Sequence, residues 1–357
     1  MKKKILVAPL NWGLGHATRC IPIINELLRR NIEVILVADG RAYDLLAKEF
    51  PTLSLHRFPG YFITYSAKIN LSLKVAMQMP KLAWGIFSEH RKLQKFISEF
   101  SIDAVISDSR FGMFSKKIPT AFITHQLAIP VPQFLGWTKK IVSHFNNFFV
   151  HQYTECWIPD YEGEKNLSGK LSHSENLPRN KYYIGALSRF QTYEIEKKYS
   201  LLVLLSGPEP QRTIFENIII EQLKNSSLIV LIVQGIPEKN EEKKIAENIT
   251  IISSLTTEKL NTAILASEII LSRSGYTTVM DLAALGKKAI FVPTPGQMEQ
   301  EYLAEMLMEE KICYTELQND FTLTQALEES KQYTGFRKED FPSSLLEKRI
   351  DEFLLKV

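Results

Sequence analysis

The chain has 357 residues, of which 45% are hydrophobic and 23% charged, a balance typical of globular proteins rather than disordered or fibrous ones. This length predicts two domains of ordinary size. The three cysteines are odd in number and far apart, which argues against a disulfide framework or a zinc site and makes a reducing cytoplasm the expected compartment. No apolar run reaches the roughly 20 residues that a membrane-spanning helix needs.

The net charge of +3 conceals an uneven distribution. Residues 61–150 carry 11 Lys and Arg against 4 Asp and Glu, whereas residues 191–357 carry 18 against 26. The basic part predicts contact with something anionic, such as a membrane or a phosphorylated acceptor. An unevenly charged, solvated surface is the alternative. The surplus is modest and no recognition motif accompanies it, so nucleic-acid binding is not expected.

The N-terminal half alternates strand and helix patterns. A short apolar run predicts a buried first strand, and apolar residues at helical spacing predict a helix after it, with Pro22 in about its first turn. Further apolar runs predict more strands. The predicted elements are a strand at 4–8, a helix at 18–30, and strands at 32–37, 103–107 and 120–124.

The C-terminal half repeats this alternation. Strands are predicted at 200–205, 227–233, 249–252, 268–271 and 288–292, and helices at 212–224, 258–266, 277–285 and 298–309. The fold class is therefore α/β, with two doubly wound, Rossmann-like domains in tandem and a cleft between them. We expect the domains at 1–165 and 166–340, followed by a C-terminal helix at 341–357. Ligands of such sheets bind beyond the carboxyl ends of the strands.

The loop after the first strand contains two glycines and ends in His16 at the start of a helix. A helix N-terminus favours an anion and lowers the pKa of an imidazole, which suits a neutral general base. A helix-capping histidine is the alternative. Thr18 stands where a dinucleotide-binding loop has its third glycine, so a nicotinamide-dependent oxidoreductase is weakly supported.

Other polar residues follow strands of the first half. Asp108 ends a strand and could orient His16, as the third member of a triad orients the base. A helix N-cap is the alternative for Asp108, and the favoured one. His125 and Gln126 follow the next strand, where they could contact an acceptor or simply begin a polar loop.

In the second half, Gly207 and Arg212 end a strand and begin a helix, where an arginine can bind a phosphate. The prolines between them remove backbone donors. A stronger segment comes after the strand at 268–271 and offers backbone and hydroxyl donors to a diphosphate, with a carboxylate one turn later for a ribose. Its candidate residues are Arg273, Ser274, Gly275, Thr277 and Asp281. Gln300 and Glu301 follow the next strand, where they could bind sugar hydroxyls or form a solvated helix face.

Together these segments resemble the GT-B glycosyltransferases, and among them the bacterial N-acetylglucosaminyltransferases that make lipid II. The opening G-x-G-H-x-x-R of that family is matched by residues 13–19, so Gly15 takes the place of its glycine, as a donor-binding candidate, and His16 that of its base. The family's donor site is matched at Ser274 and Gly275, at Asp281 for the uridine ribose, and at Gln300 and Glu301 for the sugar.

The remaining matches of this resemblance are Arg212, near the diphosphate, and His125 with Gln126 on the acceptor side. Asn11, in the loop after the first strand, is a further acceptor-side candidate. The chain departs from the family at the prolines beside Gly207, at the missing carboxylate after His125, and at Asp281, which is one methylene shorter than Glu.

The resemblance implies transfer of a sugar, N-acetylglucosamine or another hexose, from a UDP-sugar to an acceptor hydroxyl, with a lipid-linked acceptor as one option. It also implies catalysis without a metal ion or a bound cofactor, and a C-terminal helix that packs back on the first domain. A UDP-sugar 2-epimerase and a non-catalytic nucleotide-sugar-binding subunit are the alternatives. Incubation with donor alone separates the epimerase from the transferase.

Two stretches, 61–87 and 127–149, mix large apolar residues with lysines. Such a mixture predicts peripheral contact with an anionic bilayer, which would suit a lipid-linked acceptor. Core helices with basic edges are the alternative.

Overall fold

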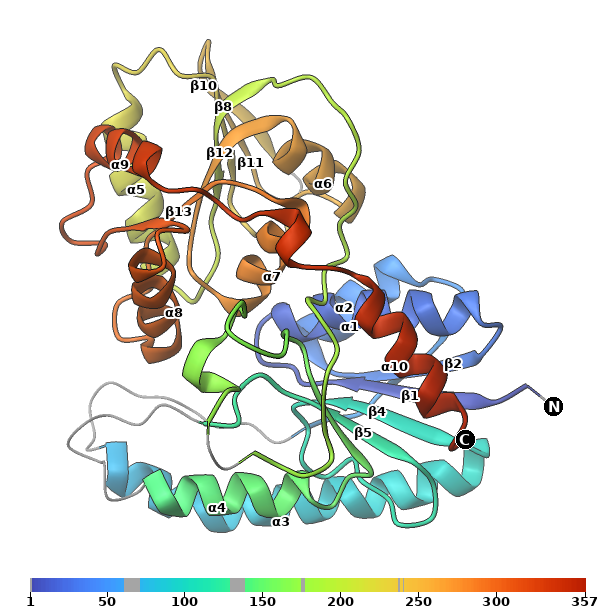
Figure 1. The fold of residues 1–357 in the computed structure, drawn as a ribbon. Helices are drawn as coiled ribbons and strands as arrows, with labels where there is room; N and C mark the ends of the chain where they lie inside the picture. The colour runs from blue at the N-terminus through green and yellow to red at the C-terminus, as the bar shows by residue number, and fades with distance from the viewer. Residues whose placement is uncertain (1, 61–70, 129–138, 175–176, 237, 240) are drawn as a thin grey trace. The chain divides into compact units, whose positions relative to one another are not determined.

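The computed structural model describes residues 2–60, 71–128, 139–174, 177–236, 238–239 and 241–357, with the backbone alone for 71–80 and 139–142 (Figure 1). The chain forms two compact units. Unit 1 comprises Met1–Leu187 and Ser343–Val357, and unit 2 comprises Ser188–Pro342.

Unit 1 contains a parallel sheet of seven strands in the order β3-β2-β1-β4-β5-β6-β7. The order reverses between β1 and β4, which is the switch point where ligands bind in open α/β sheets. The strands are β1 (Lys4–Pro9), β2 (Glu33–Ala38), β3 (Ser54–Arg57), β4 (Ala104–Asp108), β5 (Thr120–Ile123), β6 (Glu155–Ile158) and β7 (Lys181–Tyr183).

Helices cover both faces of this sheet. Leu93 of α3 packs with Leu6 and Val105, and Val150 of α4 packs with Phe122, which the strand register places on the same face. Figure 1 shows α1 and α10 on the opposite face. The helices of unit 1 are α1 (Gly15–Arg29), α2 (Gly40–Glu49), α3 (Leu71–Phe100), α4 (Lys139–Val150), α10 (Ser344–Leu354) and the short 3-10 helix η2 (Gly169–Leu171).

The C-terminal helix α10 is held on unit 1 by a buried carboxylate. Glu155 of β6 is fully buried and accepts hydrogen bonds from Trp157 Nε1 and Lys356 Nζ, both at 2.6 Å. Arg349 lies 3.5 Å from the same carboxylate and its guanidinium stacks on the ring of Tyr182 at 4.0 Å. The last helix therefore belongs to the N-terminal unit.

Unit 2 contains a seven-stranded sheet in the order β10-β11-β9-β8-β12-β13-β14, parallel except for the edge strand β10. On one face, Phe215 and Ile219 of α5 pack against Val203 and Leu271 of the central strands. The strands are β8 (Tyr199–Leu204), β9 (Val230–Val233), β10 (Glu242–Ala246), β11 (Ile249–Ile252), β12 (Ser267–Ser272), β13 (Ala289–Phe291) and β14 (Tyr314–Thr315).

The helices of unit 2 follow its parallel strands. They are α5 (Gln211–Leu223), α6 (Thr257–Leu265), α7 (Tyr276–Leu285), α8 (Met298–Glu309), α9 (Leu323–Glu329) and the 3-10 turns η3 (Ser330–Gln332) and η4 (Lys338–Asp340). In the part of the chain that the structure describes, no helix combines the length and apolarity that crossing a membrane requires.

Two details differ from the sequence prediction. Unit 1 extends to Leu187 rather than to residue 165, because β7 pairs with β6 and so completes the first sheet. Pro22 is the eighth residue of α1 rather than part of its first turn, because the helix begins at Gly15. The membrane prediction lies partly outside the described residues, at 61–70 and 129–138.

Candidate active site

The loops after β1 and β4 lie side by side at the switch point of unit 1. The backbone N–H of Leu10 donates to the carbonyl of Asp108 at 3.0 Å, which joins the two strand ends. Gly13 has a φ of +78°, a conformation that glycine adopts without strain, and it turns the chain into α1. Gly15 and His16 then form the start of that helix.

His16, Asp108 and Arg19 form one buried cluster. His16 Nδ1 lies 2.7 Å from Asp108 Oδ1. Arg19, one helical turn after His16, donates to both oxygens of Asp108 through Nε and a terminal nitrogen. Arg19 is 2% exposed and Asp108 0%, whereas the His16 side chain is 17% exposed. Asp108 is therefore not a helix cap, and the favoured alternative for it was wrong.

The charges of this cluster set its protonation states. Burial lowers the pKa of His16 below 6.5, Arg19 lowers it further, and the Asp108 carboxylate opposes both. Burial would raise the pKa of Asp108, but the charge of Arg19 and the hydrogen bonds with Arg19 and His16 outweigh burial and hold it well below its usual range. At neutral pH the cluster thus contains an ionised Asp108 beside a neutral imidazole.

The neighbours of His16 favour one tautomer of its ring. Nδ1 also lies 2.9 Å from a terminal nitrogen of Arg19, which can only donate. That nitrogen has two other acceptors, Asp108 Oδ1 and Ser109 Oγ. The carboxylate of Asp108, in contrast, can only accept. The arrangement therefore favours a proton on Nδ1 and a lone pair on Nε2, the state that a general base requires.

The acceptor-side residues have different surroundings. His125 is buried, and its Nδ1 lies 3.1 Å from Arg19 Nη1, so it supports the arginine of the cluster. Gln126 is half-buried and its backbone contacts Thr124 and Asn146. Asn11 lies against Gly40, where a Cβ would come within 2.4 Å of Asn11 Nδ2.

Three loops meet at the carboxyl ends of the central strands in unit 2. Ser274 Oγ donates to the carbonyl of Gln300 at 2.7 Å, and the Gln300 side chain accepts from the backbone N–H of Thr294 at 2.8 Å. A Cβ built on Gly207 would lie 3.6 Å from Thr294 Oγ1. The loops after β8, β12 and β13 therefore lie against one another.

Gly275 is the N-cap of α7, and a Cβ added there would meet nothing within 4 Å. The start of α7 is therefore open beside Gly275, with Thr277 half-buried in its first turn. The first backbone N–H groups of a helix have no helical acceptor and favour a phosphate.

The surroundings of Arg273 differ from those predicted for a residue that contacts a diphosphate. It is 1% exposed, and its guanidinium donates to the carbonyls of Val292, Pro293 and Gln211 at 2.9–3.1 Å. The guanidinium also packs on the ring of Phe215 at 4.3 Å. Arg273 therefore ties the loops together, because both terminal nitrogens of its guanidinium donate to the protein.

Gln300 and Glu301 also serve their own loop. The Gln300 Nε2 group donates to Gln297 Oε1 at 2.8 Å, and Gln300 is 9% exposed. Glu301 Oε1 accepts from the backbone N–H of Gly296 at 2.9 Å. The structure therefore gives Gln300 and Glu301 contacts that shape the loop after β13.

Asp281 lies on the second turn of α7 and is partly buried. Ser188 Oγ donates to its Oδ1 at 2.6 Å. Burial raises the pKa of Asp281 to about 6, while Arg189 and Ser188 act in the opposite direction. Asp281 is thus a carboxylate in a restricted environment, not an ordinary exposed helix residue.

Arg212 belongs to an ion-pair network at the start of α5. Its Nε donates to Glu209 Oε1 and its Nη1 to Glu216 Oε2, both at 2.8 Å. The Arg212 side chain is 11% exposed. Sequence reasoning missed Glu209, and it quoted Arg19 only as the last residue of the G-x-G-H-x-x-R match, without a role. The three-residue spacing from Glu209 to Arg212 and from His16 to Arg19 was the available signal.

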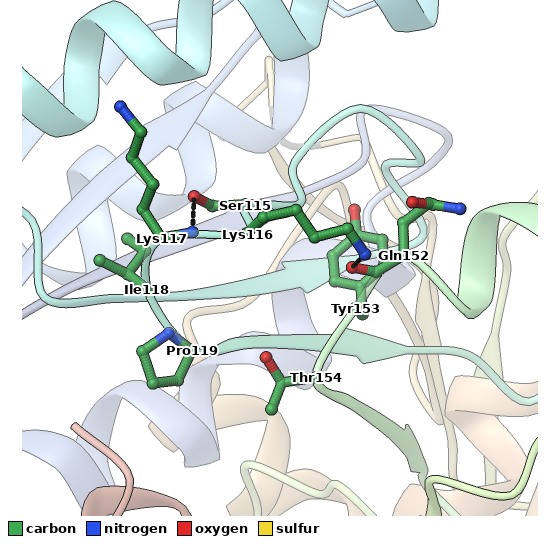
Figure 2. Close-up of a pocket in the computed structure, with 8 residues that line it drawn as sticks. All are labelled: Ser115, Lys116, Lys117, Ile118, Pro119, Gln152, Tyr153 and Thr154. Carbon is green, nitrogen blue, oxygen red and sulfur yellow. Dashed lines mark hydrogen bonds between the residues drawn. The ribbon is translucent and has the colours of Figure 1, made fainter.

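A hollow of about 320 Å³ lies at the opposite end of the first sheet, where β5 and β6 begin (Figure 2). Figure 2 shows Lys116 reaching the backbone of Gln152, where Nζ donates at 3.1 Å. This hollow is separate from the His16 cluster, which lies at the carboxyl ends of the strands. Across the described residues, no group of three His, Cys, Asp or Glu is arranged to hold a metal ion.

Two family models match separate parts of the chain. Residues 211–344 match the glycosyltransferase family 28 C-terminal domain, and residues 3–131 match glycosyl transferase family 1. The first match includes α5, α7 and α8 of unit 2, and the second includes the His16 cluster.

Two curated relatives align over most of the chain. An uncharacterized glycosyltransferase of Methanosarcina mazei is 24% identical over 330 residues, covering 86% of this chain and 84% of that protein. The UDP-N-acetylglucosamine--N-acetylmuramyl-(pentapeptide) pyrophosphoryl-undecaprenol N-acetylglucosamine transferase of Christiangramia forsetii is 26% identical over 311 residues, covering 84% and 80%.

Solved structures share the fold. Acinetobacter baumannii MurG superposes with a TM-score of 0.56 at 12% identity, covering 98% of this chain and 94% of that one. The calicheamicin glycosyltransferase CalG4 superposes with a TM-score of 0.69 at 14% identity, covering 100% and 99%. The chain is therefore a glycosyltransferase of the GT-B fold, and it resembles the family of transferases that form lipid II.

Proposed function

We propose that this glycosyltransferase moves a hexose, with N-acetylglucosamine as the first candidate, from a UDP-sugar to an acceptor hydroxyl. The observation that carries the proposal is the His16–Asp108–Arg19 cluster at the switch point of unit 1. A buried anion that holds a neutral, partly exposed imidazole is the arrangement expected of a general base for a hydroxyl nucleophile.

In this proposal unit 2 binds the donor. The open start of α7 at Gly275 receives the diphosphate, and Asp281 accepts hydrogen bonds from the uridine ribose. Arg212 adds positive charge to the leaving diphosphate. The chain's own groups would then do what a metal ion does in other transferases, so the reaction requires no added cofactor.

His16 Nε2 would take the proton of the acceptor hydroxyl as its oxygen attacks the anomeric carbon. The bond from that carbon to the diphosphate breaks, and UDP leaves. Asp108 stabilises the imidazolium that forms. A non-catalytic nucleotide-sugar-binding subunit would have no use for a base held in this way.

We further propose that the acceptor is lipid-linked and that unit 1 contacts the bilayer through α3 and α4. Trp84, Phe87 and Phe148 are 72%, 62% and 60% exposed, and both helices lie on the same side of the sheet (Figure 1). Exposed Arg91 and Lys95 continue the row of Trp84 and Phe87 along α3. Exposed aromatic rings beside cations favour an anionic membrane surface.

The donor assignment is tested by thermal unfolding with UDP, GDP, dTDP, UDP-N-acetylglucosamine, UDP-glucose, UDP-galactose and NAD. A ligand at 100 times its dissociation constant adds about 2.7 kcal/mol of stability. We expect uridine compounds alone to raise the midpoint. A shift with NAD only, or with none of the panel, would refute the donor assignment.

The membrane contact is tested by cosedimentation with vesicles of phosphatidylglycerol and phosphatidylcholine at low salt. We expect the wild type to sediment and a Trp84→Ser/Phe87→Ser variant to remain in the supernatant. Ile229→Ser is the matched control, because Ile229 is 50% exposed on unit 2. Equal sedimentation of all three proteins would exclude the α3 surface.

A further inference from the structure

A carboxylate of the chain itself occupies the cationic site at the start of α5. Glu209 Oε1 accepts from Arg212 Nε at 2.8 Å and from a terminal nitrogen of the same guanidinium. Its Oε2 accepts from the backbone N–H of Thr213, in the first turn of α5, at 3.3 Å. A guanidinium and a helix N-terminus are the two protein groups that most often bind phosphate, and here both hold Glu209.

Glu209 is the exchangeable member of this network. Its side chain is 55% exposed, whereas Arg212 and Glu216 are 11% and 10% exposed. Residues 206–210, the loop that contains Glu209, are exposed throughout. Arg212 therefore stays in place through Glu216 when Glu209 leaves, because the Nη1 bond at 2.8 Å does not involve the loop.

A second observation indicates a ligand at the same loop. Thr294 is 2% exposed, and its Oγ1 has no hydrogen-bond partner among the described residues. This oxygen lies against Gly207 of the loop, where an added Cβ would be 3.6 Å away. Buried polar groups in proteins nearly always have partners, so the hydroxyl indicates that the loop has another position in which a ligand supplies one.

We propose that Glu209 is an internal competitor of the donor, which holds Arg212 and the start of α5 until a diphosphate replaces it. This inference rests on the proposed UDP-sugar donor and adds to it a specificity-determining residue. Exchange of a carboxylate for a diphosphate disfavours ligands with too little negative charge, because they cannot displace Glu209. The same exchange moves the 206–210 loop from Thr294 and gives its hydroxyl a phosphate oxygen as partner.

The test is calorimetric titration of UDP, uridine and inorganic pyrophosphate into the wild type and Glu209→Gln. An exposed ion pair that must break before binding weakens apparent affinity about two- to fivefold, so Glu209→Gln should bind UDP and pyrophosphate more tightly by about that factor. Uridine affinity should not change. Glu221→Gln is the matched control, because Glu221 forms an exposed pair with Lys224 on the same helix at the same spacing.

Arg212→Gln, alone and combined with Glu209→Gln, completes the design. If the competition acts through Arg212, Glu209→Gln has no effect on UDP affinity in the Arg212→Gln background. Unchanged or weaker UDP binding by Glu209→Gln would overturn the inference and leave the proposed donor standing. An equal gain for uridine, or a gain that survives Arg212→Gln, would also overturn it.

Failure of the donor assignment gives a different pattern. A wild type that binds neither UDP nor uridine contradicts the proposed donor, and pyrophosphate then decides the inference alone. Tighter pyrophosphate binding by Glu209→Gln supports the competition, and equal binding refutes it. A purely structural Glu209 would instead lower the melting temperature when replaced and leave every affinity unchanged.

Discussion

Arg19 and Asp108 form a two-point ion pair across 89 residues of sequence, and neither is more than 2% exposed. The pair joins the first turns of α1 to the end of β4, so the fold itself brings the base and its orienting carboxylate together. His16 contacts Asp108 from the more exposed side of the pair. The ion pair therefore determines both where the imidazole lies and which of its nitrogens is available.

Replacement of His16 by Ala should lower kcat by about 10²–10⁴-fold, because a general base contributes that much. UDP affinity should stay within twofold, since His16 is in unit 1 and the proposed donor contacts are in unit 2. Steady-state kinetics and calorimetry measure the two quantities. Turnover near the wild-type rate would remove His16 from this role.

Most strands and helices could be predicted because each carries a local pattern. The apolar run at 4–8 becomes β1, and the helix predicted at 277–285 becomes α7. The short strands β3, β6, β7, β10 and β14 were missed, although β6 is buried along its whole length. Four buried residues carry no periodicity that distinguishes a strand from a helix segment. This omission also moved the predicted domain boundary.

Some features of the candidate site could likewise be predicted from the sequence, and others could not. The pairing of His16 with Asp108 was the less favoured interpretation of Asp108, and it was available because both residues stand at the ends of strands of one parallel sheet. The burial of Arg273 could not be predicted, because its acceptors are the backbone carbonyls of Gln211, Val292 and Pro293. Every residue has such a carbonyl, so the sequence does not show which ones an arginine will contact. Glu209 was overlooked because a glutamate near a helix start is usually a solvated residue.

The pH dependence of transfer should report the His16 pKa. Burial and Arg19 lower this pKa below 6.5, so kcat/KM should be flat near neutrality and fall only below pH 6.5. Asp108→Asn removes the charge that raises the His16 pKa. In that variant the acid limb should move to lower pH while the plateau drops. An acid limb that moves upward would contradict the assigned electrostatics.

The lowered pKa of His16 should also make the stability of the protein depend on pH. A histidine whose folded pKa lies below its unfolded value of 6.5 takes up protons more readily when unfolded. Its contribution to stability is therefore complete above pH 6.5 and is lost as the pH falls toward the folded pKa. Urea unfolding of His16→Gln should show a smaller stability loss between pH 7 and pH 5 than the wild type. Parallel loss in both proteins would count against a depressed pKa.

Donor binding should depend on pH through Asp281. Its folded pKa of about 6 means that the carboxylate becomes protonated between pH 7 and pH 5 and then accepts hydrogen bonds poorly. UDP-N-acetylglucosamine affinity should fall over this window in the wild type and stay level in Asp281→Asn. The nucleotide sugar is the suitable ligand because its diphosphate does not titrate there. A wild-type affinity that ignores pH would contradict the ribose assignment.

Protonation of Asp281 should weaken donor binding but stabilise the folded protein. A carboxyl whose pKa is raised on folding from 3.8 stabilises the protein fully only below the unfolded value, and this contribution is lost as pH rises through about 6. The free energy of unfolding of Asp281→Asn minus that of the wild type should therefore be more positive at pH 7.5 than at pH 5. Urea unfolding at the two pH values measures the difference.

Glu155 should be needed for the attachment of α10. Glu155→Gln keeps the volume but removes the anion of Lys356 and leaves Arg349 with Glu352 alone, at 2.8 Å. Loss of one partner of a fully buried pair costs about 3–5 kcal/mol, which is the upper bound here because Lys356 is 42% exposed. Glu33→Gln is the control, because Glu33 is 46% exposed in its pair with Lys4 and should change stability by less than about 1 kcal/mol. Equal losses in the two variants would show that α10 does not depend on this contact.

Thr294→Val removes one hydroxyl and should have opposite effects on stability and on UDP affinity. The variant is nearly isosteric and removes a buried hydroxyl that has no partner among the described residues. The free energy of unfolding without ligand should stay the same or rise by up to about 1–3 kcal/mol, since an unsatisfied polar group no longer needs to be buried. UDP affinity should fall several-fold if the hydroxyl donates to the diphosphate. A loss of stability would instead mean that the hydroxyl already has a partner, such as a bound water, and UDP affinity equal to that of the wild type would remove Thr294 from the donor site.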